Sequence, residues 1–155
     1  MRGDGGLALL AGLGSAALLG GAFYFQYVLG MAPCELCLWQ RWPHGAAVLL
    51  GLLAWVWPGA PVLLAGAGAA AATGGIGVYH TGIERGWWPG PSACSGAVDL
   101  SRLSAEQMLD AILAAPVVRC DEVAWEMLGL SMASWNALAS FALAAVWLVA
   151  LKPRA

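Results

Sequence analysis

The chain has 155 residues, of which 61% are hydrophobic and only 10% are charged, and its formal net charge is -2. Soluble domains average about 45–50% apolar and about 25% charged residues, so this composition excludes an ordinary soluble protein. It also excludes a basic nucleic-acid-binding surface, because the sequence holds no run of lysine or arginine. We therefore predict an integral membrane protein, with one domain over 1–155, whose partner on most of its surface is the lipid bilayer.

Four apolar segments predict membrane-spanning helices. Each has about 20 residues, enough to cross about 30 Å of hydrocarbon at about 1.5 Å per residue. The length of the first segment favours a retained helix over a cleaved signal peptide. The predicted spans are 7–29, 38–57, 62–83 and 129–151. The predicted fold class is therefore an all-α integral membrane protein, built as a four-transmembrane-helix bundle.

The second segment differs from the others because its uninterrupted apolar part, 45–57, covers only about 20 Å. It reaches full length by including Arg41, Pro43 and His44, which places the arginine near the membrane interface. The proline leaves two helix starts open. The helix begins either at Trp42, where proline suits the first turn, or several residues earlier with the proline inside it.

A tight turn at 58–61 makes the second and third segments antiparallel neighbours. Alternation of the four segments then puts both chain termini on one side of the membrane and the loops 30–37 and 84–128 on the other. The third segment is rich in glycine and alanine, a composition that lets helices pack closely in lipid.

The long polar loop over 84–128 is predicted to carry one short amphipathic helix. Ser104 and Gln107 have the spacing of a capping box, which satisfies backbone N–H groups at a helix start. The helix must end before Pro116. Its apolar residues fall on one flank, so we expect it to lie flat at the membrane surface.

The four cysteines form two pairs on the same predicted side of the membrane. Cys34 and Cys37 follow the first apolar segment, and Cys94 and Cys120 lie in the long loop. Basic residues do not decide the orientation, since three flank the termini and four lie on the cysteine side. Disulfides persist on the oxidising side of a membrane, so we expect the cysteines in the periplasm and the termini in the cytoplasm.

The Cys-x-x-Cys spacing of Cys34 and Cys37 suits either a redox-active dithiol or two ligands of a metal ion. A zinc site needs two further ligands, but the other cysteines are 26 positions apart, and His44 and His80 lie beside or inside apolar segments. We interpret the pair as a redox dithiol. A metal-binding or metal-transport module that uses cysteine and histidine ligands, and a packing subunit with inert disulfides, are the alternatives.

Arg41 follows Cys37 by one helical turn on the same face. A permanent cation at this position lowers the pKa of a nearby thiol and stabilises an anionic electron acceptor. The alternative is a structural arginine whose side chain only extends to place its charge at the membrane interface. Most tryptophans are interpreted as interfacial anchors, and Trp39 and Trp42 are in addition candidates to wall a flat aromatic ligand. His80 is a candidate proton relay or hydrogen-bonding group.

The stretch Pro-Cys-Glu-Leu-Cys-Leu-Trp-Gln-Arg over 33–41 and the pattern around 120–132, in which Trp125 and a Leu-Gly-Leu run follow Cys120, resemble the disulfide bond formation protein B (DsbB) family. The resemblance covers the whole chain. The sequence departs from the family at Pro43 and His44, where other members often have small apolar residues.

This resemblance implies a four-helix bundle in the bacterial inner membrane that reoxidises a periplasmic, DsbA-like thioredoxin-fold protein. Two electrons would pass to a membrane quinone, ubiquinone or menaquinone. By motif position, Cys94 would form a mixed disulfide with the partner, Cys120 would attack Cys34, and Cys37 would react with the quinone. The implied quinone-binding residues are Cys37, Arg41 and His80.

Overall fold

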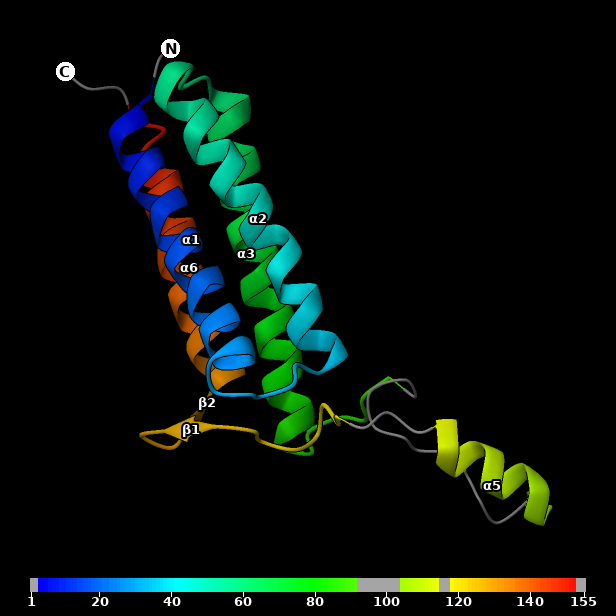
Figure 1. Cartoon of the computed structure of the whole chain (residues 1–155). Helices are drawn as coiled ribbons and strands as arrows, with labels where there is room; N and C mark the ends of the chain where they lie inside the picture. The colour runs from blue at the N-terminus through cyan, green and yellow to red at the C-terminus, as the bar shows by residue number, and fades with distance from the viewer. Residues whose placement is uncertain (1–2, 92–103, 115–117, 153–155) are drawn as a thin grey trace.

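The computed structural model describes residues 3–91, 104–114 and 118–152. Four long helices lie side by side and a shorter one stands away from them beyond one end of the bundle (Figure 1). A two-stranded antiparallel hairpin precedes the last helix. The elements are α1 (Gly5–Tyr27), α2 (Glu35–Val56), α3 (Ala60–Glu84), α5 (Ala105–Ala114), β1 (Glu126–Met127), β2 (Leu130–Ser131) and α6 (Met132–Val149).

Among the described residues, three helices are long and apolar enough to cross a membrane: α1, α3 and α6. The helix α2 has 22 residues, but Gln40, Arg41 and His44 make its first half too polar for that criterion. In the sequence, this is the segment whose uninterrupted apolar part, 45–57, was too short to cross the hydrocarbon layer by itself. The chain is therefore a mostly helical membrane protein.

The second helix starts at the earlier of its two possible positions. Cys34 is the N-cap of α2, and Pro43 lies inside the helix rather than in its first turn. Proline has no N–H to donate, so the hydrogen bond that would close the turn onto Trp39 is missing.

The last helix starts three residues later than predicted, because a hairpin occupies 126–131. Leu128 and Gly129 at its tip have φ angles of 56° and 77°, the left-handed conformation that a two-residue type I′ turn requires. Ser131 then caps α6 by accepting a hydrogen bond from the backbone N–H of Ser134 at 3.2 Å. The prediction of an all-α fold therefore missed this hairpin. The only sequence signal for it is the single glycine, Gly129.

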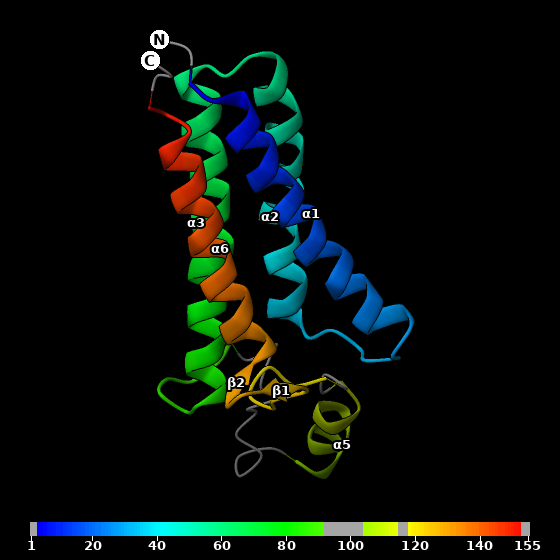
Figure 2. The same ribbon diagram turned by 90° about the vertical axis from the view of Figure 1, so that its left-hand side faces the viewer.

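Glycines set how closely the helices pack, as the composition of the third segment predicted. A Cβ added at Gly66 would lie 2.6 Å from the ring of Trp147, and one at Gly77 would lie 3.0 Å from the carbonyl oxygen of Ala133. These contacts join α3 to α6, while Gly12 and Gly51 meet where α1 crosses α2. Two helix pairs result, which Figure 2 shows side by side.

Both described ends of the chain lie at one end of the bundle (Figures 1 and 2). The backbone N–H of Gly3 donates to the carbonyl of Pro58, and that of Asp4 to the carbonyl of Ala150. The hairpin and α5 lie at the opposite end. The turn after α2 and the two termini therefore share a side, and the loop that follows α1 lies on the other.

The predicted capping box is present at the start of α5. The backbone N–H of Gln107 donates to Ser104 Oγ at 3.3 Å, and the backbone N–H of Ser104 donates to Gln107 Oε1 at 3.0 Å. The helix ends at Ala114, and Pro116 lies outside the described residues. Leu109 and Leu113 on one side of this helix are both exposed. That this side rests on a membrane surface stays a prediction.

Candidate functional site

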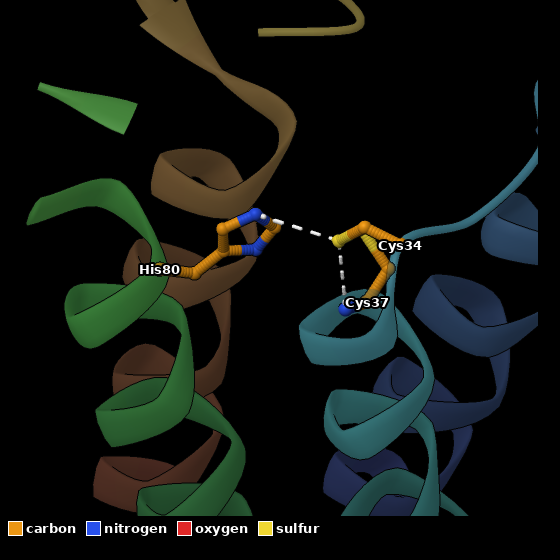
Figure 3. Close-up of side chains that lie close together, drawn as sticks. All are labelled: Cys34, Cys37 and His80. Atoms are coloured by element: carbon orange, nitrogen blue, oxygen red, sulfur yellow. Dashed lines mark hydrogen bonds between the residues drawn. The ribbon is translucent and has the colours of Figure 1, made fainter. Parts of the chain in front are cut away.

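The dithiol of Cys34 and Cys37 lies at the first turn of α2. The Cys34 Sγ accepts a hydrogen bond from the backbone N–H of Cys37 at 3.3 Å, so the sulfur itself caps the helix (Figure 3). Both residues are free thiols, and their Sγ atoms lie 2.8 Å apart. Unpaired N–H groups and the dipole at a helix N-terminus stabilise a thiolate. The pair is therefore placed to ionise and to form a sulfur–sulfur bond with little movement.

The two thiols ionise unequally. The hydrogen bond from the Cys34 thiol lowers the pKa of Cys37 below its ordinary 9.0 against the opposing effect of burial, and Arg41 adds a smaller contribution of the same sign. The same hydrogen bond, together with burial, raises the pKa of Cys34. Cys37 is therefore the more acidic of the two thiols, and Cys34 is the less acidic one.

Arg41 lies one helical turn after Cys37, and its side chain is held by α1. Its Nη1 donates to Gln26 Oε1, and the carbon at the centre of the guanidinium lies 5.0 Å from the centroid of the Phe23 ring. Its Nε is buried and has no hydrogen-bond partner among the described residues. The Arg41 guanidinium is therefore a cation held in place near the Cys37 thiol, and its Nε–H is a hydrogen-bond donor without a partner among the described residues.

His80 reaches the dithiol from α3, on the facing side (Figure 3). Its Nε2 lies 3.6 Å from Cys34 Sγ and 3.8 Å from Glu84 Oε1, and its Nδ1 lies 3.1 Å from Gln40 Nε2. Gln40 Nε2 also donates to the carbonyl of Leu36, which can only accept, so this amide nitrogen is the donor toward Nδ1. The neutral ring therefore carries its proton on Nε2, which faces the Cys34 sulfur, the Glu84 carboxylate and the Cys120 backbone.

Cys120 joins the same buried group of side chains. It is fully buried and disulfide-bonded, and it packs in one cluster with Cys34, Leu36 and Ile83. His80 also hydrogen-bonds to its backbone. Cys94 lies outside the described residues. The structure thus brings three of the four cysteines to the end of the bundle opposite the termini, while the roles assigned to them stay predictions.

A cavity of about 340 Å³ opens beside the dithiol, within the usual range for small-molecule sites. Apolar side chains of α1, α6 and the segment 118–127 form most of its wall. A few polar groups converge on it from α2, α3, α6 and the segment 118–127. These polar lining residues include Cys37, Gln40, Arg41, His44, His80 and Asn136.

The prediction that Trp39 and Trp42 wall this site is wrong. They are 53% and 81% exposed, since their positions on α2 point away from the face that carries Cys37 and Arg41. The tryptophans that line the cavity are Trp125 and Trp135. Trp147 is not an interfacial anchor either, because it is fully buried against Gly66.

Sequence reasoning missed the polar residues that hold the site residues in place. Gln26 fixes Arg41, Gln40 orients His80, and Asn136 bridges Gln40 to His44. The available signal was their position: each is an amide side chain in or beside an otherwise apolar segment, where an unpaired polar group is costly.

Comparison with known proteins identifies the group to which the chain is related. The family model described as "Disulfide bond formation protein DsbB" matches residues 5–150. A disulfide bond formation protein B of Stutzerimonas stutzeri (strain A1501) is 32% identical over 150 residues, covering 92% of this chain and 91% of that protein. Its counterpart in Polaromonas sp. (strain JS666) is 30% identical, covering 90% and 86%. The one in Pasteurella multocida (strain Pm70) is 31% identical, covering 74% and 66%.

No solved structure matches the chain. The family match extends from the start of α1 to the end of α6, so it includes every described element. The chain belongs to the DsbB family of disulfide bond formation proteins.

Proposed function

We propose that this member of the DsbB family reoxidises a periplasmic, DsbA-like thioredoxin-fold protein and passes two electrons to a membrane quinone. The electrons would travel through Cys94 and Cys120 to Cys34 and Cys37. The observation that carries the proposal is the burial of the Cys120 sulfur in one cluster with the free dithiol. Thiol–disulfide exchange needs direct contact between an attacking thiolate and a disulfide sulfur, and the shared cluster supports such a contact between Cys120 and Cys34.

Each step exchanges one sulfur–sulfur bond for another. A thiolate of the partner would attack Cys94, forming a mixed disulfide and releasing Cys120 as a thiolate. Cys120 would then attack Cys34 of an oxidised Cys34–Cys37 pair, so that Cys37 leaves with the electron pair. The lowered pKa of Cys37 suits this part, because a thiol with a low pKa is the better leaving group.

The residues of the cavity fit a quinone. The cavity is largely apolar, which suits a lipid-soluble ring, and the unpartnered Nε of Arg41 is a buried donor that a carbonyl oxygen would satisfy. Cys37, Arg41 and His80 would hold the ring, and a bound quinone, ubiquinone or menaquinone, would supply a two-electron acceptor. Arg41 favours negative charge beside Cys37, and His80 Nε2 lies 3.6 Å from Cys34 Sγ.

The proposed setting is the bacterial inner membrane, with α1, α2, α3 and α6 all crossing the bilayer. The termini would lie in the cytoplasm and the cysteines in the periplasm, where disulfides persist. The shared position of both termini at the end opposite the dithiol supports this arrangement.

A quinone-reduction assay tests the proposal, with a reduced thioredoxin-fold dithiol protein as electron donor and a short-tailed quinone as acceptor. Wild-type protein should sustain turnover, and Cys37→Ala should reduce it to background. Trp42→Ala is the matched control, because that side chain is 81% exposed and should leave turnover within about twofold. Unchanged turnover in Cys37→Ala would overturn the proposal.

A covalent trap tests the role of Cys94 separately. In Cys120→Ala, Cys94 is a free thiol, and there is no Cys94–Cys120 disulfide for a reduced partner to attack. The partner is therefore supplied with its second cysteine replaced and its attacking cysteine held as a mixed disulfide with thionitrobenzoate. The Cys94 thiolate should displace thionitrobenzoate and keep the partner attached, because Cys120 is absent and cannot resolve the new bond. Non-reducing electrophoresis should show the adduct, and additional replacement of Cys94 should remove it. Absence of any adduct in Cys120→Ala would refute the assignment.

Metal binding is a second candidate, because the ligand atoms of Cys34, Cys37 and His80 lie within 4.8 Å of one another. The sulfur spacing disfavours it. Two thiolates on one tetrahedral zinc ion at about 2.3 Å lie about 3.8 Å apart, whereas these sulfurs are 2.8 Å apart. Stoichiometric zinc or copper in the purified protein, measured by elemental analysis, would favour the metal function instead.

A further inference from the structure

His44 is a buried polar residue of the cavity wall that the proposed electron route does not use. It is 3% exposed and follows Cys37 and Arg41 on the same face of α2, at the spacing of successive helical turns. Its Nε2 lies 2.8 Å from Asn136 Oδ1 on α6. The other ring nitrogen, Nδ1, is buried and has no hydrogen-bond partner among the described residues.

The hydrogen-bond network fixes which nitrogen of His44 carries the proton. Gln40 Nε2 donates to the Leu36 carbonyl, so the other amide atom of Gln40, Oε1, must be an acceptor. Asn136 Nδ2 donates to that Oε1 at 2.7 Å, which leaves Asn136 Oδ1 facing His44 as an acceptor. His44 Nε2 must therefore be the donor.

A second hydrogen-bond partner of the Asn136 amide, Thr73, fixes the same orientation of that amide. Thr73 Oγ1 donates its only proton to the backbone carbonyl of Gln40 at 3.1 Å, so it can only accept from Asn136 Nδ2, 3.2 Å away. Both partners make Oδ1 the atom that receives the His44 proton. Neutral His44 thus carries at Nδ1 a buried lone pair that receives no hydrogen bond from the described residues, in a side chain that lines the largely apolar cavity.

A buried acceptor without a donor calls for one from a ligand. The oxidised and reduced forms of a quinone differ in this respect: the quinone has only carbonyl acceptors, whereas the hydroquinone carries two hydroxyl donors. We propose that His44 Nδ1 accepts a hydrogen bond from a hydroxyl of a bound 1,4-hydroquinone, so that this cavity binds the reduced form more tightly than the oxidised form. This inference rests on the proposed function, since it concerns the product of the same site.

Preferential binding of the reduced form makes the bound acceptor a stronger oxidant of the dithiol. By linkage, each tenfold preference raises the two-electron potential of the bound couple by about 30 mV. His44 would thereby favour electron transfer away from Cys37 without taking part in sulfur chemistry.

The test compares two probes that the reduced dithiol cannot oxidise: a short-tailed 1,4-hydroquinone and its dimethyl ether, which has no hydroxyl donors. Their dissociation constants are measured by calorimetry under nitrogen, with reduced full-length protein in detergent micelles. Wild-type protein should bind the hydroquinone at least about tenfold more tightly than the ether, the factor that one good hydrogen bond contributes.

His44→Leu should remove most of that preference by weakening hydroquinone binding, with the ether bound within about twofold of wild type as evidence that the cavity is intact. His44→Gln, whose amide both donates and accepts, should restore part of it. An unchanged ratio of the two affinities in His44→Leu would overturn the inference.

If His44→Leu fails to fold, ¹⁵N NMR of histidine-labelled wild-type protein decides the question. The resonance of the unprotonated Nδ1 should move upfield with the hydroquinone and stay in place with the ether. An Nδ1 resonance that responds to neither probe would overturn the inference. These results are distinct from failure of the proposed function, which would appear as hydroquinone binding without quinone turnover in wild-type protein.

Discussion

The difference between the two sulfurs of the dithiol is a property of individual residues that an alkylation experiment can measure. Because the pKa of Cys37 lies below 9.0, its thiolate is present above that lowered pKa and reacts first as the pH rises. In reduced protein, iodoacetamide at neutral pH should therefore modify Cys37 faster than Cys34. Peptide mass spectrometry of samples taken over time at several pH values would measure both rates.

A pair of variants isolates the cause of this difference. Cys34→Ser keeps a hydroxyl donor for the Cys37 sulfur, whereas Cys34→Ala removes the donor. The alanine variant should shift the alkylation midpoint of Cys37 upward, lowering its rate at pH 7 by roughly tenfold for each unit of pKa. Equal midpoints in the two variants would show that the Cys34 hydrogen bond does not set the reactivity of Cys37.

The part of the site that depends on local spacing was predictable at this scale, and the part that depends on contacts between helices was not. Cys37 and Arg41 share a face because they are one turn apart. The partners of Arg41 on α1 and of His44 on α6 depend on how separate helices rotate and cross, which no spacing within one segment contains. Trp39 and Trp42 show the converse error, since closeness in sequence to the dithiol placed them on the wrong face.

At the scale of elements, the contact between α3 and α6 depends on residues without side chains. A Cβ at Gly77 would lie 3.0 Å from the carbonyl oxygen of Ala133 and 3.1 Å from the backbone nitrogen of Ala137, and backbone atoms cannot move aside. Gly77→Val should therefore force the helices apart and lower the free energy of unfolding by about 1–3 kcal/mol. The midpoint of unfolding in a titration with dodecyl sulfate would measure the loss.

Gly75 provides the matched control on the same helix. A Cβ at this position meets nothing within 4 Å, so Gly75→Val should change the free energy of unfolding by less than about 0.5 kcal/mol. Equal losses in both variants would mean that valine in α3, rather than its contact with α6, is responsible.

Element boundaries show where a local pattern is ambiguous. Pro43 allowed two starts for α2, and the earlier one is found because the Cys34 sulfur caps the helix and α2 packs along both α1 and α3. The capping box of α5 depends only on neighbours in sequence and was predictable. The hairpin before α6 was not, because it needs a positive φ at Leu128, a residue that rarely adopts one.

For the molecule as a whole, polarity changes along the bundle axis. Near the termini the core is made of small apolar residues around Trp147. Toward the other end it gives way to the network of Thr73, Asn136 and Gln40, and then to the buried cluster that holds Cys34. The outward faces carry exposed leucine, valine and tryptophan side chains, as lipid contact requires. The proposed chemistry is thus confined to one end, and under the proposed function this end would face the compartment of the partner.

That orientation can be tested with two single cysteines introduced into a variant whose four native cysteines are serine. Ala32→Cys lies in the loop before the dithiol, and Gly59→Cys lies in the turn beside the termini, where a Cβ meets only ordinary contacts of 3.5 Å or more. If the dithiol end faces the periplasm, a membrane-impermeant maleimide added to intact spheroplasts should label the first variant. The second should be labelled only after the membrane is opened with detergent. The reverse pattern would place the dithiol in the cytoplasm, and labelling of both from outside would exclude a bundle that spans the bilayer.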